Sequence, residues 1–152
     1  MCAKKRISIV RALAMLLALA LIAPIGANAA AVQTVQPCAS NYLTSYSAYV
    51  YPAGSGKVQV YFTVKATGYM DDIGALTIKI YESTDNSTWY WVKSFSNGNY
   101  PSMLSQNDYF HGSHVEYQGV AGRYYKAYVC VWAGKNNGGD TRYFWTSAKL
   151  AS

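Results

Sequence analysis

A strict alternation of apolar and polar residues over 57–67 is the feature that most constrains the fold of this chain. One set of alternate positions holds Val58, Val60, Phe62, Val64 and Ala66. The set between them holds Gln59, Tyr61, Thr63, Lys65 and Thr67. Because successive side chains of a β-strand point to opposite faces, this pattern predicts a strand with one buried and one exposed face.

Shorter stretches with the same period follow, and turn residues separate them. After an expected turn over 68–74, the alternation resumes with Leu76, Ile78 and Ile80. A polar turn over 85–88 precedes an expected strand over 89–95, whose inner face is either Tyr90 and Val92 or Trp89, Trp91 and Phe95. We expect an irregular loop over 96–112, followed by a short strand that contains Val115 and Tyr117.

The last third of the chain has the pattern of a β-hairpin. The inward positions are Tyr125, Ala127, Val129, Val131 and Ala133. The run 136–139 supplies an Asn-Asn-Gly-Gly turn, and 142–150 is the expected return strand. About seven short strands without a helix predict an all-β, antiparallel, two-sheet sandwich of the immunoglobulin-like or fibronectin type III-like kind over 42–152. A small barrel is the alternative.

The N-terminal residues 1–29 have the order of a secretory signal peptide. Lys4, Lys5, Arg6 and Arg11 precede an uncharged, Leu- and Ala-rich run over 12–22. Small residues at Ala27 and Ala29 then form a cleavage site after Ala29. The apolar run is shorter than the roughly 20 residues of a membrane-spanning helix, so we expect secretion without a permanent membrane anchor. Residues 30–41 are expected to form an extended arm.

Charge and cysteine content change when the signal is removed. Four of the 13 basic residues and none of the 7 acidic residues lie in 1–29, so the net charge falls from +6 to +2. No basic run remains, which argues against a nucleic-acid partner. Cys38 and Cys130 are the two remaining cysteines, and outside the cell we expect them to form a disulfide. Lipidation of Cys38 is the alternative, but Val35-Gln36-Pro37 is a poor lipobox.

Two resemblances bear on the architecture. The run 122–131, in which a Tyr opens an alternating strand, resembles the sixth strand of fibronectin type III and immunoglobulin-like domains, and the turn before Trp89 is similar to their third hairpin. Nearly all of the domain also resembles a family of small secreted proteins of Gram-positive bacteria without an assigned activity. Segments 67–70, 73–75, 100–103, 111–117 and 133–142 carry that resemblance. It implies a secreted sandwich and transfers no catalytic residue.

Candidate catalytic and metal-binding residues do not form a recognisable pattern. His111 and His114 would share one face only in a helix, so their spacing gives little support for zinc. The acidic candidates for hydrolysis are scattered over Asp71, Asp72, Glu82, Asp108, Glu116 and Asp140. We expect Glu82 and Glu116 at solvated strand positions and Asp85 and Asp140 in turns. No nucleophile motif is present, so we expect neither an enzyme nor a bound cofactor or metal.

The run 140–142 follows two glycines, so Asp140 and Arg142 could present a carboxylate and a guanidinium at a hairpin tip. Ordinary turn chemistry is the favoured interpretation. In that case Asp140 bonds its own backbone and Arg142 makes a surface ion pair.

Aromatic residues give the best functional hypothesis. The chain has 15 Tyr, 4 Trp and 4 Phe, while the inward positions are mostly aliphatic, so many rings must lie on outer faces. Lys126, Tyr128, Cys130 and Trp132 alternate with the inward residues of their strand. The predicted ligand-binding residues are Tyr81, Lys126, Tyr128, Trp132, Tyr143 and Trp145. Such a face could stack cell-wall or host glycans, or bind a surface protein.

Two other interpretations of this chain remain open. Because Cys130 shares the aromatic face, a disulfide to Cys38 could lay the arm across the rings and make them a minor core. At the level of function, a secreted non-catalytic interaction module is the leading hypothesis. A bacteriocin-like effector is the first alternative, and a small hydrolase is the second.

Overall fold

A computed structural model describes residues 40–152. The predicted signal peptide, its cleavage site at Ala29, and the arm as far as residue 39 lie outside the described residues. The described strands are β1 (Leu43–Gly54), β2 (Lys57–Ser83), β3 (Tyr90–Ser96), β4 (Leu104–Gln118), β5 (Tyr124–Lys135), β6 (Gly138–Trp145) and β7 (Lys149–Leu150). A short 3-10 helix, η1 (Pro101–Met103), precedes β4. Within residues 40–152 no helix is long and apolar enough to cross a membrane.

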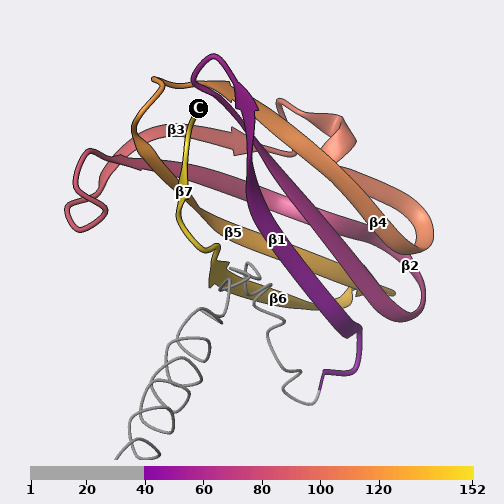
Figure 1. The fold of residues 1–152 in the computed structure, drawn as a ribbon. Coiled ribbons are helices and arrows are strands. Elements are labelled where there is room, and N and C mark those ends of the chain that lie inside the picture. The colour runs from indigo at the N-terminus through magenta and orange to yellow at the C-terminus, as the bar shows by residue number, and fades with distance from the viewer. Residues whose placement is uncertain (1–39) are drawn as a thin grey trace, which may run out of the picture. The chain divides into compact units, whose positions relative to one another are not determined.

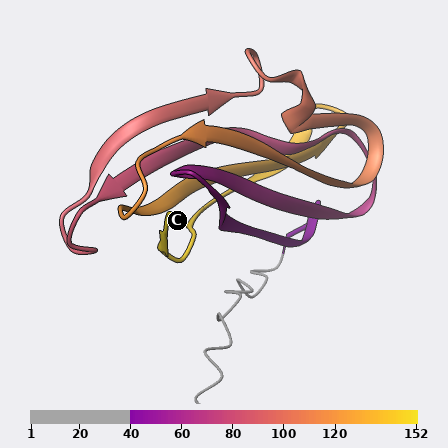
Figure 2. The ribbon, with the colours of Figure 1, turned by 45° about the horizontal axis from the view of Figure 1, so that its top comes forward.

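All seven strands belong to one antiparallel sheet, and β2 is its centre. The first half of β2 pairs with β1 on one side and β4 on the other, and its second half pairs with β5 and β3. The sheet curls along β2, as Figures 1 and 2 show. The predicted all-β, antiparallel class is confirmed, while the division into two separate sheets stays a prediction.

The turn predicted over 68–74 is wrong, because β2 continues through it as a strand of 27 residues. Its pairing with β4 shifts register between Lys65 and Met70 and resumes at the Met70–Asp108 pair. Gly74 has a φ of +147°, a value that L side chains rarely adopt. These irregularities let one strand bend where a chain break was expected.

The core consists of the inward side chains that the alternation identified. The five apolar positions over 58–66 are at most 4% exposed, and the inward residues of β5 are fully buried. Leu76 is the exception, because the register of β2 against β5 shifts between Ala75 and Thr77 and removes Leu76 from the alternation. Ile78 and Ile80 are buried as predicted.

Strand β3 pairs only with β2, so one of its edges is unpaired by the described strands. Phe95 is buried, whereas Tyr90 and Trp91 are exposed and Val92 is half-buried. Neither predicted inner set for this strand is therefore right as a whole. The register shift opposite Ile80 and Tyr81 interrupts the period-two pattern on which both alternatives depended.

Strand β4 occupies much of the stretch 96–112 that was expected to be an irregular loop. Its side chains are mostly polar, and Val115 is its one buried residue. The strand lies at the border of the sheet and pairs only with β2. The predicted short strand with Val115 and Tyr117 is confirmed as the end of β4. The earlier part has few apolar side chains, so hydrophobic alternation does not reveal it.

The predicted hairpin of β5 and β6 is confirmed, with Asn136 and Asn137 both at positive φ in its turn. The return strand begins and ends earlier than the predicted 142–150, because β6 starts at Gly138, inside the predicted turn, and ends at Trp145. The Thr146 N–H then donates to the Ala127 carbonyl at 2.9 Å. Strand β7 follows and pairs with the first residues of β5.

A buried polar group joins β2 to the start of β5. The Tyr125 hydroxyl donates to the Glu82 carboxylate and accepts from the Val120 N–H at 2.8 Å. Arg123 forms an ion pair with the same carboxylate. Glu82 is only 14% exposed, so its expected solvated position is wrong. Burial, followed by the hydrogen bond to Glu82, raises the pKa of Tyr125 to about 12.

Candidate functional site

Pairing of β2, β5 and β6 gathers most of the predicted ligand-binding residues on one surface. On β5 the outward positions are Lys126, Tyr128, Cys130 and Trp132. Tyr81 lies opposite Lys126, Trp145 lies opposite Tyr128, and Tyr143 lies opposite Cys130. We call the group Tyr81, Trp89, Lys126, Tyr128, Tyr143 and Trp145 the β5–β6 aromatic cluster.

The rings of this cluster contact one another across the strands. Trp145 is central, with ring centroids 4.9 Å from Tyr81 and 4.8 Å from Tyr128. Tyr128 also stacks on Tyr143 at 5.9 Å with an interplanar angle of 19°. Cross-strand aromatic pairs of this kind stabilise a sheet by roughly 0.2–1 kcal/mol each, so part of the cluster is structural.

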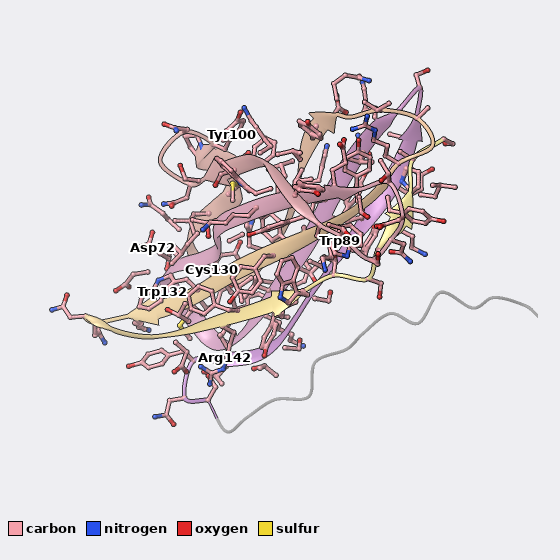
Figure 3. The ribbon with its side chains drawn as sticks, turned by 90° about the vertical axis from the view of Figure 1, so that its left-hand side faces the viewer. Asp72, Trp89, Tyr100, Cys130, Trp132 and Arg142 are labelled. Atoms are coloured by element: carbon pink, nitrogen blue, oxygen red, sulfur yellow. The ribbon has the colours of Figure 1, made fainter. Side chains whose placement is uncertain are left out.

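Lys126 places its ammonium group between two tryptophan rings. Its Nζ lies 4.2 Å from the ring centroid of Trp89 and 4.6 Å from that of Trp145. Both distances are within the range of cation–π attraction. Trp89, labelled in Figure 3, is a member of the cluster that the sequence did not identify. The only hint was that Trp89 began a strand whose inner face was ambiguous.

Exposure separates the residues that a ligand can reach from those that support them. Tyr143 is 61% exposed and Trp145 is 42% exposed. Tyr81, Trp89, Lys126 and Tyr128 are half-buried. A ligand on this surface would therefore meet Tyr143 and Trp145 first.

Trp132 does not contact the rings of the cluster and packs instead on the hairpin. A Cβ built on Gly139 would lie 2.2 Å from the Trp132 ring, and one built on Gly134 would lie 2.3 Å from it. The ring therefore covers the backbone of two glycines. Figure 3 shows Trp132 toward the opposite end of the sheet from Trp89. The structure thus separates Trp132 from the other five predicted site residues.

Cys130 lies on the same surface but is buried, with 4% exposure. Burial raises the pKa of the Cys130 thiol. Cys38 lies outside the described residues, so the predicted disulfide and the covering of the rings by the arm stay predictions. Cys130 is buried within residues 40–152, and Tyr143 is its cross-strand partner on β6.

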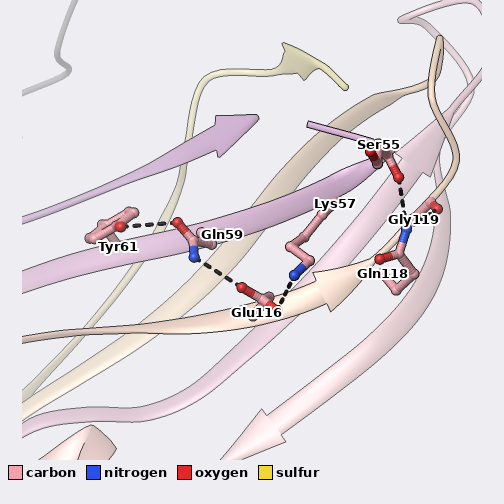
Figure 4. Close-up of polar contacts among 7 residues, drawn as sticks. All are labelled: Ser55, Lys57, Gln59, Tyr61, Glu116, Gln118 and Gly119. Carbon is pink, nitrogen blue, oxygen red and sulfur yellow. Dashed lines mark hydrogen bonds and ion pairs between the residues drawn. The ribbon is translucent and has the colours of Figure 1, made fainter. Parts of the chain in front are cut away.

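A second aromatic group lies on the outer side of β1, β2 and β4, and the sequence did not identify it. Tyr49, Tyr61 and His114 are cross-strand partners and form a stack, with centroid distances of 5.2 and 4.9 Å. In Figure 4 the Tyr61 hydroxyl donates to Gln59, whose amide donates to Glu116. Lys57 Nζ completes this network 2.9 Å from Glu116. The expected solvated position of Glu116 is confirmed.

The two histidines lie on opposite faces of β4. His111 contacts the buried Phe62 ring, and one of its ring nitrogens lies 2.9 Å from the Ser102 carbonyl oxygen. His114 stacks on Tyr61 at the outer surface. A spacing of three residues in a strand gives this result, so the two side chains cannot share a metal ion. The described part of the chain contains no cluster of three or more His, Cys, Asp or Glu residues suited to a metal.

Asp140 has a different role from the one expected. Its carboxylate accepts from the Ser40 hydroxyl and from the Tyr42 N–H at 3.1 Å, so it fixes the start of β1 to β6. These bonds, that from Ser40 above all, lower the pKa of Asp140. Arg142 donates to the Thr141 carbonyl at 2.9 Å, where a surface ion pair was expected. The predicted bond of Asp140 to its own backbone and the predicted surface ion pair of Arg142 are therefore both wrong.

Comparisons with known proteins add little to this geometry. No protein-family model and no curated protein matches the sequence. Among solved structures, the chain is similar to a family 76 glycoside hydrolase from a bovine Bacteroides thetaiotaomicron strain, with 16% identity and a TM-score of 0.32. That match covers 72% of this chain and 20% of the hydrolase, so this chain spans only a small part of that protein. A TM-score this low supports no inference about fold or activity.

Proposed function

We propose that the chain is a secreted, non-catalytic binding module that holds carbohydrate on the β5–β6 aromatic cluster. The observation that carries this proposal is the exposure of Tyr143 and Trp145 beside three further rings and Lys126 on one sheet face. The apolar C–H faces of sugars pack on aromatic rings, while ammonium and phenol groups bond to sugar hydroxyls. Cell-wall or other extracellular glycans are the expected partners, with a surface protein as the alternative.

The non-catalytic part of the proposal rests on how the carboxylates are engaged. Hydrolysis of a glycosidic bond by two carboxyl groups needs both of them beside the substrate. Glu82 is paired with Arg123 and lies opposite the inward-facing Tyr125. Glu116 is paired with Lys57 on the outer side of β1, β2 and β4. Neither carboxylate lies on the proposed binding surface.

Secretion follows from the signal-like residues 1–29, and the predicted disulfide between Cys38 and Cys130 fits the same oxidising compartment. The resemblance to small secreted proteins of Gram-positive bacteria agrees with a location outside the cell.

We also propose that the fold is of the immunoglobulin-like sandwich class. Two features support this: β2 changes its partner from β1 to β5 at its bend, and the Tyr125 hydroxyl bonds to the backbone five residues upstream. A tyrosine at the start of the sixth strand that bonds upstream backbone is a feature of such domains, and β5 is the sixth strand when the two halves of β2 are counted as two.

A pull-down with insoluble glycans tests the proposed function. The chain is expressed from its full-length sequence and purified in the form that the cell yields, then sedimented with purified bacterial cell wall and insoluble polysaccharides. Saturable binding is expected for the wild type. Tyr143→Ala and Trp145→Ala should each weaken binding about tenfold, which is the effect of losing a central aromatic contact.

Tyr49→Ala and Tyr51→Ala are the matched controls, because both rings are exposed and lie on β1, which pairs with the other half of β2. They should bind like the wild type. Thermal unfolding of every variant shows whether each remains folded. Equal loss of binding in all four variants, or no binding by the folded wild type, would contradict the proposed site.

A further inference from the structure

We infer that the carbohydrate held by the β5–β6 aromatic cluster is anionic, carrying carboxylate or phosphate groups. The inference rests on the proposed function and adds the class of ligand. It starts from two lysines on the same outer surface, Lys126 on β5 and Lys79 on β2. Lys79 lies opposite Tyr128, which makes it a diagonal neighbour of Lys126. Side chains in this relationship start about 7–8 Å apart.

The distribution of acidic residues leaves this part of the surface positive. The chain has 7 acidic residues, and all of them fall within residues 40–152. Their positions are therefore known, and no carboxylate forms an ion pair with Lys79 or Lys126 in the described structure. The residues concerned are Asp71, Asp72, Glu82, Asp85, Asp108, Glu116 and Asp140.

Asp72 is the acidic residue on the same outer side of this part of the sheet, and it lies at the far end. It is paired with Gly134, while Lys79 is paired with Tyr128, six residues away along β5. At about 3.4 Å per residue this is a separation of roughly 20 Å, well beyond the Debye length of about 8 Å at physiological salt. Figure 3 shows Asp72 and Trp89 toward opposite ends.

Lys126 is held in place without being neutralised. The Trp89 and Trp145 rings restrict its ammonium by cation–π contacts, and such contacts leave the full positive charge on the nitrogen. A ligand anion therefore meets a charged group whose side chain is already ordered. Less conformational entropy is lost on binding than for a free lysine.

The opposite arrangement is found beside the Tyr49, Tyr61 and His114 stack. There the Lys57 ammonium lies 2.9 Å from the Glu116 carboxylate, so the local charge is balanced. Both outer surfaces carry rings, but only the surface of the β5–β6 aromatic cluster, with the adjacent Lys79, combines rings with two lysines that lack a carboxylate partner among residues 40–152. This difference is what selects an anionic ligand for the cluster.

Binding to soluble polysaccharides with matched neutral forms tests the inference. Polygalacturonate is compared with its fully methyl-esterified form, and dextran phosphate with dextran, by titration calorimetry at low salt. We expect at least one charged polymer to bind about tenfold or more tightly than its neutral form. The two pairs distinguish a carboxylate-bearing from a phosphate-bearing ligand. Polyglutamate serves as a polyanion without sugar rings and should bind at least about tenfold more weakly.

Charge-removing variants locate the effect. Lys79→Gln, at an exposed position, should weaken binding of the charged polymer about threefold to tenfold, and Lys126→Gln should weaken it by at least as much. Lys65→Gln is the matched control, because Lys65 is also exposed on β2 but lies in the half that pairs with β1 and β4. It makes the same change in net charge and should leave the affinity within about twofold.

The outcomes separate this inference from the proposed function. Equal affinity for charged and neutral polymers, lost in Tyr143→Ala but kept in Lys79→Gln, would overturn the anionic ligand and leave the carbohydrate module standing. Polyglutamate binding as tight as polygalacturonate binding would overturn the inference, because the ligand would then be any polyanion. Absence of binding to every polysaccharide would overturn both.

Discussion

The Tyr125 hydroxyl and the Glu82 carboxylate form a hydrogen bond at the buried start of β5, and the same hydroxyl accepts from the Val120 N–H. Tyr125→Phe removes both bonds, including the one that the partly buried Glu82 carboxylate accepts. We expect the free energy of unfolding to fall by about 2 kcal/mol, a typical loss for a bond to a charged group. Urea unfolding measures it. Tyr124→Phe, at a half-buried neighbouring position, should cost less than about 0.5 kcal/mol, and equal losses would contradict this role.

Alkaline pH should destabilise the protein through the same residue. The pKa of Tyr125 is raised from 10.0 to about 12 in the folded chain. A raised pKa in the folded state means that this contribution to stability is complete below pH 10 and is lost as the pH rises toward 12. Unfolding midpoints measured between pH 9 and 12 should fall more steeply for the wild type than for Tyr125→Phe. Parallel curves would show that Tyr125 does not carry the effect.

Acidic pH should act through Asp85, which organises the turn between β2 and β3. Backbone N–H groups of Thr88 and Ser87 and the Ser83 hydroxyl donate to its carboxylate and lower its pKa. A lowered pKa means that the stabilisation is present above the ordinary value of 3.8 and is lost as the pH falls below it. Asp85→Asn should therefore reduce the dependence of stability on pH between 5 and 2, measured by thermal unfolding. An unchanged slope would contradict the assignment.

The contact of Trp132 with the hairpin glycines predicts a steric effect. Gly139→Ala places a methyl group against the Trp132 ring and should lower the free energy of unfolding by about 1–3 kcal/mol. Gly98→Ala is the matched control, because a Cβ there meets nothing within 4 Å, and it should change stability by less than about 0.5 kcal/mol. Chemical denaturation of both variants makes the comparison. Similar losses would show that the ring moves aside freely.

Trp132→Ala should distinguish packing from ligand binding. The ring lies apart from the β5–β6 aromatic cluster, so its removal should lower stability while glycan binding stays within about threefold of the wild type. The pull-down used for Tyr143→Ala measures both proteins side by side. Loss of binding in a folded Trp132→Ala protein would return Trp132 to the binding site.

The predicted disulfide can be tested by intact mass. Protein recovered from an oxidising compartment should gain two hydrogen atoms on reduction if Cys38 and Cys130 are linked. In the reduced protein, Cys130 should react slowly with thiol reagents, because the thiol is buried and its pKa is raised. Rapid labelling of Cys130 under native conditions would contradict its burial in the folded domain.

The parts of the fold that could be predicted are those governed by hydrophobic period alone. The alternate residues from Val58 to Ala66 and from Tyr125 to Ala133 are buried, as the alternation predicted. Successive side chains of a strand point to opposite faces, so the face of one residue fixes the faces of its neighbours. The first part of strand β4, over 104–112, escaped detection because its pairing with β2 depends on backbone groups, which every residue supplies. The continuation of β2 through its bend was not predicted for the same reason. Gly68 and Gly74 resemble turn residues as long as the pairing of β2 with β4 on both sides of the bend is unknown.

For the candidate site, the sequence placed outward residues correctly along each strand but could not place the rings relative to one another. Tyr81 and Tyr128 both contact the Trp145 ring. These contacts depend on two registers, that of β2 with β5 and that of β5 with β6, and long-range strand pairing sets both registers. Trp89 joins them from outside β3. Trp132, equally outward in sequence terms, turns toward glycines that its own hairpin presents.

Strand β2 contacts β1, β3, β4 and β5, and this sharing has a consequence for how the domain opens. Strands β1, β3 and β4 pair only with β2, so each of them can detach alone, whereas β2 leaves the sheet only when all four of its partners separate. The amide protons in the middle of β2 should therefore exchange with deuterium only when the whole domain unfolds. Their free energies of opening should all equal the free energy of global unfolding. Those of β6, which pairs with β5 alone, can exchange through a smaller local opening. The strand that supplies Lys79 to the binding surface is thus among the last parts of the molecule to move.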